Sequence, residues 1–110
     1  MIRDPLIYLG HILDSATAIA EYISGIKKAE FLRDPKLRDA VIRRLEIIGE
    51  ATKRITEEIK ERDKSIPWKQ MAGLRDILIH DYAFVDPEAV WNVAKHDVPK
   101  LAKKISVLLV

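Results

Sequence analysis

The 110-residue sequence contains no cysteine and no long apolar run. The absence of cysteine excludes a disulfide scaffold, a thiolate metal site and a cysteine nucleophile, and it fits a reducing compartment. No apolar stretch is long enough to cross a bilayer, and the first five residues lack the basic-then-apolar order of a secretory signal. We therefore expect a cytoplasmic protein that does not span a membrane.

The remaining composition is that of a folded domain. Hydrophobic residues make up 48% of the chain and charged residues 33%, with a net charge of +2. This length suits one compact unit, so we expect residues 1–110 to form a single domain with a substantial core. The small positive charge permits an anionic partner without requiring one.

Apolar residues recur at helical spacing along the chain, and no strand-period alternation, glycine-rich loop or internal repeat is present. Asp–Pro pairs predict three helix starts, because aspartate caps a helix and proline fits its first turn. The five expected helices begin near residues 5, 27, 35, 67 and 87. Pro99 should kink the last one, since proline removes an amide donor. The predicted fold class is all-α, a bundle of four or five helices.

Gly49 lies inside the expected third helix, where glycine costs about 1 kcal/mol relative to alanine. It is either a surface position or, as we favour, a place where another helix approaches closely, within the bundle or across a dimer interface. Nearby, Glu46 and Glu50 form a like-charge i, i+4 pair, which is unfavourable unless a cation lies between them. An arginine from a second subunit is one candidate for that cation.

The most informative segment is residues 74–82, near the end of the expected fourth helix. Arg75 can hold a phosphate through several N–H donors, and His80 can transfer a proton. RNA cleavage without a metal needs a base for the 2′-OH, an acid for the leaving 5′-oxygen and a cation at the phosphate. The same residues also fit a purely structural helix end, with Arg75 paired to a neighbouring aspartate and Tyr82 packed in the core.

The spacing limits how Arg75 and His80 can act together. At roughly 100° per residue they lie about 140° apart around a continuous helix. A shared site therefore needs the reach of the arginine side chain, a helix that ends near His80, or a second subunit that places two copies face to face. Asp76 is four residues before His80, so its carboxylate is a possible helper that orients the imidazole.

Arg75, His80 and Tyr82 form an R-x4-H-x-Y pattern that resembles the motif of HEPN-domain ribonuclease toxins, the HepT family. The resemblance covers nearly the whole chain and includes, in the family's order, residues 44–51, 66–68, 73, 85–86 and 97–101. It implies an up-and-down helical bundle that acts as a homodimeric, metal-independent endoribonuclease toxin, with Arg75 and His80 as the catalytic residues. RNA, not DNA, is the expected substrate, and cleavage is expected to need no cofactor.

The resemblance also implies a protein partner. Toxins of this HEPN/MNT (HepT/MntA, type VII) system have a cognate MNT-type antitoxin, a minimal nucleotidyltransferase that uses ATP and Mg²⁺. That enzyme can transfer AMP to the motif tyrosine, here Tyr82, to give O-AMP-tyrosine. One residue departs from the pattern, because Asp76 occupies a position where these toxins most often have asparagine. Ionised aspartate only accepts hydrogen bonds and repels a phosphate, which leaves its helper role open.

An alternative function is a non-catalytic helical module that dimerises and presents a nucleotide or substrate to the same nucleotidyltransferase. His11 and His96 have no partners at metal-ligand spacing, so we expect structural histidines and no metal site. Trp68 and Trp91 are expected in the core or an interface. The basic residues of the third helix fit either a solvated face or an RNA-backbone track. These are Lys36, Arg38, Arg43, Arg44, Lys53 and Arg54.

Overall fold

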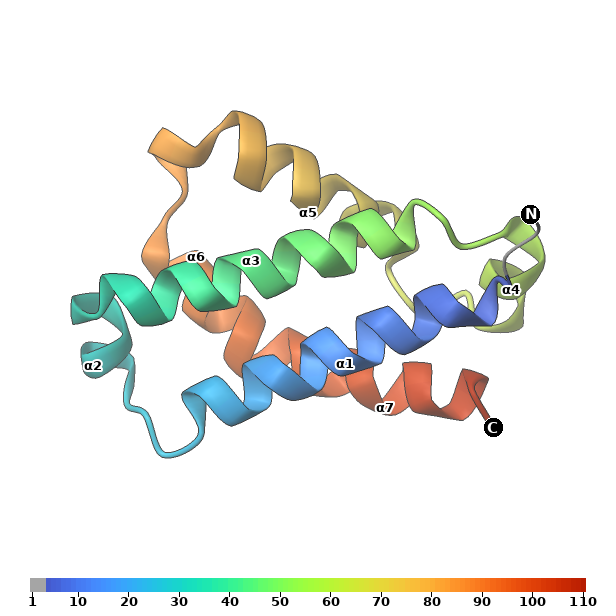
Figure 1. The fold of residues 1–110 in the computed structure, drawn as a ribbon, viewed down its shortest axis with the longest axis horizontal. Helices are drawn as coiled ribbons and strands as arrows, with labels where there is room; N and C mark the ends of the chain where they lie inside the picture. Colours follow the sequence, from blue (N-terminus) through green and yellow to red (C-terminus); the bar gives the residue numbers. More distant parts are fainter. Residues whose placement is uncertain (1–3) are drawn as a thin grey trace.

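A computed structural model describes residues 4–110, except for the side chain of Phe84, and its helices form one bundle (Figure 1). The helices are α1 (Leu6–Ile23), α2 (Lys28–Arg33), α3 (Pro35–Thr52), α4 (Glu57–Arg62), α5 (Trp68–His80), α6 (Pro87–Asn92) and α7 (Val98–Leu108). A 3-10 turn, Tyr82–Phe84, follows α5, and a π-helical turn, Val93–Asp97, joins α6 to α7. The prediction of an all-α bundle is confirmed.

Side-chain caps begin two helices at the predicted Asp–Pro pairs. Asp34 accepts a hydrogen bond from the backbone N–H of Leu37 at 3.1 Å, and Asp86 accepts one from Glu88 at 3.0 Å. The proline that follows each aspartate lies in the first turn, where its missing N–H removes no helical bond. Beyond the end of α1, Gly25 has a φ of 72°, a conformation that glycine adopts without steric cost.

The helix α3 packs between α1 and α5, and α1 also packs against α7. In Figure 1, α1 and α3 lie side by side in antiparallel directions, while α5 follows the opposite side of α3. Fully buried aliphatic side chains from α1, α3 and α7 meet in the core, and each contributes about 1.5–3 kcal/mol. They include Leu9, Ile12, Ile19, Val41, Leu45, Ile48 and Ile105. Trp68 and Trp91 are buried as well, so of the two predicted positions, core or interface, both occupy the core.

The last predicted helix is interrupted, as expected, close to Pro99. This proline is the second residue of α7, directly after the π-helical turn. A π turn changes the hydrogen-bond register, so the amide that proline lacks falls at the junction rather than inside a regular helix. The interruption therefore divides the segment into α6 and α7.

The helix α4 was not predicted as a separate element, because its charged sequence resembles a solvated helix end. Thr56 accepts a hydrogen bond from the N–H of Ile59 at 3.4 Å, and Ile59 is buried, so a short helix forms. The turn that follows fixes the start of α5, since the indole N–H of Trp68 donates to the carbonyl of Asp63 at 3.0 Å. Within the described part of the chain, no helix is long and apolar enough to cross a membrane.

Candidate functional site

The helix α5 lies directly against α3 at Gly49. A Cβ atom at Gly49 would lie 2.8 Å from both the Cβ and the backbone nitrogen of Arg75, and 3.1 Å from the carbonyl oxygen of Met71. The two distances of 2.8 Å are too short for a real Cβ and that of 3.1 Å is unusually tight, and two of the three atoms belong to the backbone. The missing side chain therefore permits the contact, and the predicted close approach at Gly49 is confirmed within the bundle.

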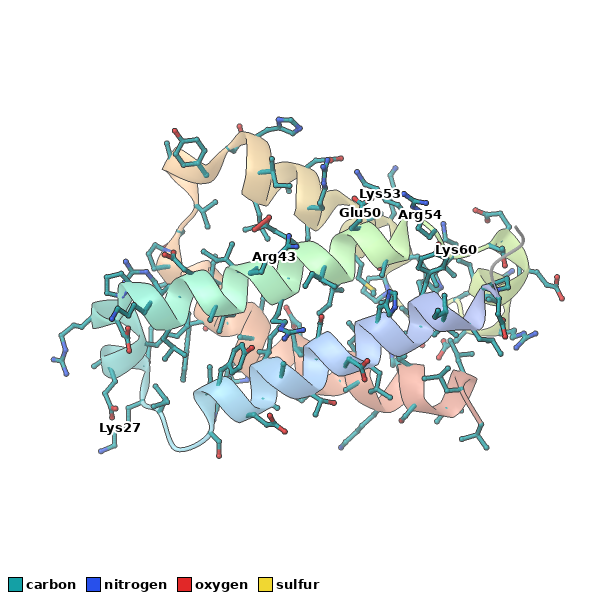
Figure 2. All side chains as sticks on the ribbon, in the orientation of Figure 1. Lys27, Arg43, Glu50, Lys53, Arg54 and Lys60 are labelled. Carbon is teal, nitrogen blue, oxygen red and sulfur yellow. The ribbon has the colours of Figure 1, made fainter. Side chains whose placement is uncertain are left out.

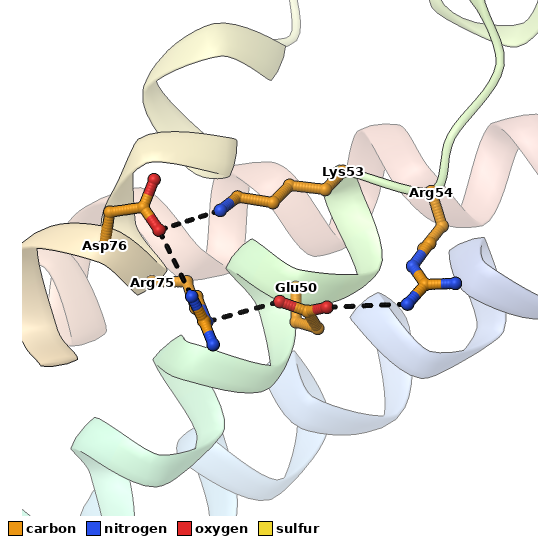
Figure 3. Close-up of polar contacts among 5 residues, drawn as sticks. All are labelled: Glu50, Lys53, Arg54, Arg75 and Asp76. Carbon is orange, nitrogen blue, oxygen red and sulfur yellow. Dashed lines mark hydrogen bonds and ion pairs between the residues drawn. The ribbon is translucent and has the colours of Figure 1, made fainter.

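This contact places Arg75 beside Glu50. The Arg75 Nε lies 3.3 Å from one carboxylate oxygen of Glu50, and the other oxygen lies 3.8 Å from the guanidinium of Arg54 (Figure 3). Glu50 therefore has two cations from its own chain, Arg75 and Arg54, and these offset its repulsion by the like-charged Glu46. A second subunit is not needed to supply them.

Asp76 extends the network on the other side of Arg75. Its Oδ1 accepts hydrogen bonds from the Lys53 ammonium at 2.8 Å and from Arg75 Nη1 at 3.4 Å. The hydrogen bond from Lys53, with the nearby charges of Lys53 and Arg75, holds the pKa of the Asp76 carboxyl below its usual value. Among the described residues, no hydrogen bond joins Asp76 to His80. A helper role for Asp76 toward the imidazole stays a prediction.

His80 and Tyr82 have a different environment from Arg75. His80 is the last residue of α5 and is exposed, while Tyr82 begins the 3-10 turn with 78% of its surface exposed. The alternative of Tyr82 packed in the core is wrong for this chain. Because α5 is continuous from Arg75 to His80, their separation of about 140° and about 7.5 Å along the axis persists. Arg75 faces α3, whereas His80 faces solvent.

A groove of about 300 Å³ lies between α1, α3 and α5, beside Arg75. Tyr8 and His11 line it from α1, and Arg43 and Arg54 line it from α3. The sequence predicts only a structural role for His11. Its place in the same groove as Arg75 could not be predicted, because only the packing of α1 on α3 creates it. The one sequence signal was the spacing of Arg43, Glu50 and Arg54 along one side of the third helix.

A second, mainly apolar groove of about 310 Å³ lies between α3, α5 and α7 and includes Met71, Leu74 and Leu101.

A metal site would need several ligating side chains placed close together. In the part of the chain that the structure describes, no three histidine, aspartate or glutamate side chains are placed together as ligands. Cleavage without a metal stays a prediction.

The sequence also matches a known family over most of its length. The family model described as Ribonuclease HepT-like matches residues 12–108. The chain belongs to the HepT-like ribonuclease family. The predicted family is therefore confirmed, and the R-x4-H-x-Y pattern of this sequence lies on α5 and the turn after it.

Several relatives of this HepT-like chain are similar over nearly all of it. A Methanocaldococcus jannaschii protein named "Putative RNase" is 42% identical over 106 residues, which are 96% of this chain and 97% of that one. A Thermococcus cleftensis protein named "Probable ribonuclease HepT" is 44% identical over 101 residues, 92% of each chain. A longer M. jannaschii protein, named "Gamma-glutamylcyclotransferase and putative RNase", is 48% identical over 105 residues, which are 96% of this chain and 47% of that protein. No solved structure matches the chain significantly.

Proposed function

We propose that this HepT-like protein is a metal-independent endoribonuclease toxin in which Arg75 binds the scissile phosphate and His80 transfers protons. The observation that carries the proposal is the fixed position of Arg75, which Gly49 and two carboxylates hold beside a groove that contains further arginines. Arg75 Nη2 makes no hydrogen bond among the described residues and is available to a phosphate oxygen. A guanidinium so placed stabilises the charge that develops during phosphoryl transfer.

The active unit in this proposal is a homodimer. Arg75 and His80 point in different directions, and the exposed side chains of Ile77 (55%) and His80 lie near each other at the end of α5. Burial of these side chains against a second copy would favour association and bring two motifs together. In such a dimer, Arg75 of one chain, packed against α3, would share a site with the exposed His80 of the partner subunit.

The chemical step needs two imidazoles in opposite protonation states. One His80 takes the proton of the 2′-OH, and the 2′-oxygen attacks phosphorus. The bond from phosphorus to the 5′-oxygen breaks, and His80 of the partner subunit donates a proton to that oxygen. The products are a 2′,3′-cyclic phosphate and a free 5′-OH, with Arg75 stabilising the phosphorane-like transition state.

Control of the toxin, in this proposal, acts on Tyr82. Its exposed phenol gives its proton to a base of an MNT-type antitoxin, and the phenol oxygen attacks the α-phosphorus of ATP held there with Mg²⁺. The bond from the α-phosphorus to the bridging oxygen breaks, and pyrophosphate leaves. The attached AMP adds bulk and negative charge two residues from His80, which opposes binding of a phosphate backbone at the exposed end of α5. The exposure of Tyr82 supports this role, because a modifying enzyme must reach the hydroxyl.

A non-catalytic module that presents a nucleotide to the same partner is the second candidate, because the ion pairs of Arg75 with Glu50 and Asp76 also suit a structural role. Expression of the chain alone separates the two. The toxin should arrest growth, His80→Ala should relieve the arrest, and purified protein should cleave RNA in EDTA to 2′,3′-cyclic phosphate ends. Full cleavage by the His80→Ala protein would reject the catalytic assignment, and a strict need for Mg²⁺ would reject the metal-independent mechanism.

A further inference from the structure

Three arginines and two glutamates line the groove between α1, α3 and α5. Arg54 and Arg75 are both ion-paired with Glu50, whereas Arg43 is exposed and makes no ion pair or hydrogen bond among the residues that the structure describes. An unpaired guanidinium at the edge of a groove is available to an anionic ligand. The volume of about 300 Å³ lies at the lower end of the range for small-ligand sites.

Arg43 and Arg75 meet the groove at different points along α3. Arg75 contacts α3 at Glu50 (Figure 3). Glu50 follows Arg43 by seven residues on the same helix (Figure 2), and two helical turns bring it back to the same side. Seven residues span about 10.5 Å along an α-helix. Arg43 therefore reaches a position along the groove that a neighbouring phosphate of the same strand would occupy.

The wall of the groove on α1 has a different chemistry. Tyr8 is half-buried and His11 is exposed, and their rings meet edge to face with their centroids 5.8 Å apart. Aromatic rings provide surfaces on which unpaired bases stack, with little preference for sequence. A guanidinium on one side and two rings on the other match the two parts of a nucleotide, its phosphate and its base.

We infer that this groove is a nucleotide subsite for single-stranded RNA, which binds the nucleotide next to the scissile phosphate. Arg43 contacts the phosphate of that nucleotide, and the rings of Tyr8 and His11 contact its base. The inference rests on the proposed function, because it assumes that Arg75 binds the scissile phosphate. It assigns substrate binding, and no proton transfer, to Arg43 and His11.

Binding to a fluorescent single-stranded oligoribonucleotide tests the subsite in the His80→Ala background, where the substrate stays intact. Adding Arg43→Ala should weaken binding about fivefold at 0.1 M salt and lower the slope of log affinity against log salt by about 0.7, the contribution of one phosphate contact. Arg33→Ala is the matched control, because Arg33 is exposed at the end of α2 and unpaired among the described residues. Equal effects of the two arginines would overturn the subsite.

Kinetics and crosslinking give independent readouts in the otherwise unaltered protein. Arg43→Ala should raise KM about fivefold and leave kcat nearly unchanged, since a contact kept throughout the reaction affects ground and transition states equally. A 4-thiouridine placed next to the cleavage site should crosslink to the peptide that contains Tyr8 and His11, and His11→Ala should reduce the yield. A kcat loss for Arg43→Ala, or crosslinks only to other elements, would reject the subsite while leaving RNA cleavage intact. A wild-type protein that neither binds nor cleaves RNA would reject the proposed function itself and the subsite with it.

Discussion

The two ends of the R-x4-H-x-Y segment differ in how the fold holds them. Arg75 lies against Gly49, with Glu50 and Asp76 as ion-pair partners, so its position is set before any ligand arrives. His80 and Tyr82 lie at the exposed end of α5. The bundle itself fixes the position of Arg75, whereas in the proposed mechanism His80 and Tyr82 need a second molecule to complete their surroundings.

The largest expected effect separates activity from stability at the exposed end. His80→Ala should lower kcat for RNA cleavage by about 10²–10⁴-fold, the usual contribution of a general acid or base. Its melting temperature should stay unchanged, because the side chain is exposed. Arg75→Lys should also lose most of the activity, since lysine offers a point charge in place of a planar fork. Cleavage assays and thermal melts on wild type and both variants measure the two effects.

Gly49→Ala should lower both the stability and the activity of the protein through the Arg75 end of the segment. The added Cβ would push on the backbone of Arg75, and overpacking of this kind costs about 1–3 kcal/mol, partly offset by about 1 kcal/mol of helix propensity. Activity should fall with stability, because Arg75 is displaced. Gly10→Ala in α1 is the control, since its Cβ would meet nothing within 4 Å. Chemical denaturation that finds both variants equally stable would contradict the close contact.

Glu50→Gln should have a smaller effect, confined to Arg75. Exposed ion pairs contribute about 0–1 kcal/mol, so kcat should fall by at most about fivefold. Glu46→Gln is the matched control, because Glu46 lines the same groove and makes no ion pair among the described residues. Steady-state kinetics should show the loss for Glu50→Gln only. An equal loss in both variants would mean that the groove responds to net charge and not to the Arg75 contact.

The smallest expected effect concerns Asp76→Asn. Lys53 and Arg75 lower the pKa of Asp76, so the charged carboxylate contributes stability fully above the unfolded pKa, and this contribution is lost as pH falls through the folded pKa. The difference in melting temperature between wild type and Asp76→Asn should therefore be constant across the neutral range and shrink only in acid. A difference that changes steadily through neutral pH would contradict this ionisation.

The sequence predicted the parts of the molecule that depend on local patterns. Asp34 and Asp86 begin helices because each precedes a proline, and Gly49 indicated a close contact because glycine is costly inside a helix. The partner of Glu50 and the groove beside His11 could not be predicted, because residues far apart in the sequence form them only when α1, α3 and α5 pack together. Whether Arg75 and His80 act on one phosphate stays a prediction.

A subunit-mixing experiment tests most directly whether a second copy completes the exposed end of α5. Wild-type and His80→Ala chains are mixed in increasing ratios, allowed to form mixed dimers by refolding together, and assayed for RNA cleavage at constant total protein. If one cleavage needs His80 from both subunits, an equal mixture should retain about one quarter of the wild-type activity. Retention of about one half, with activity falling in proportion to the wild-type fraction, would contradict the two-subunit site.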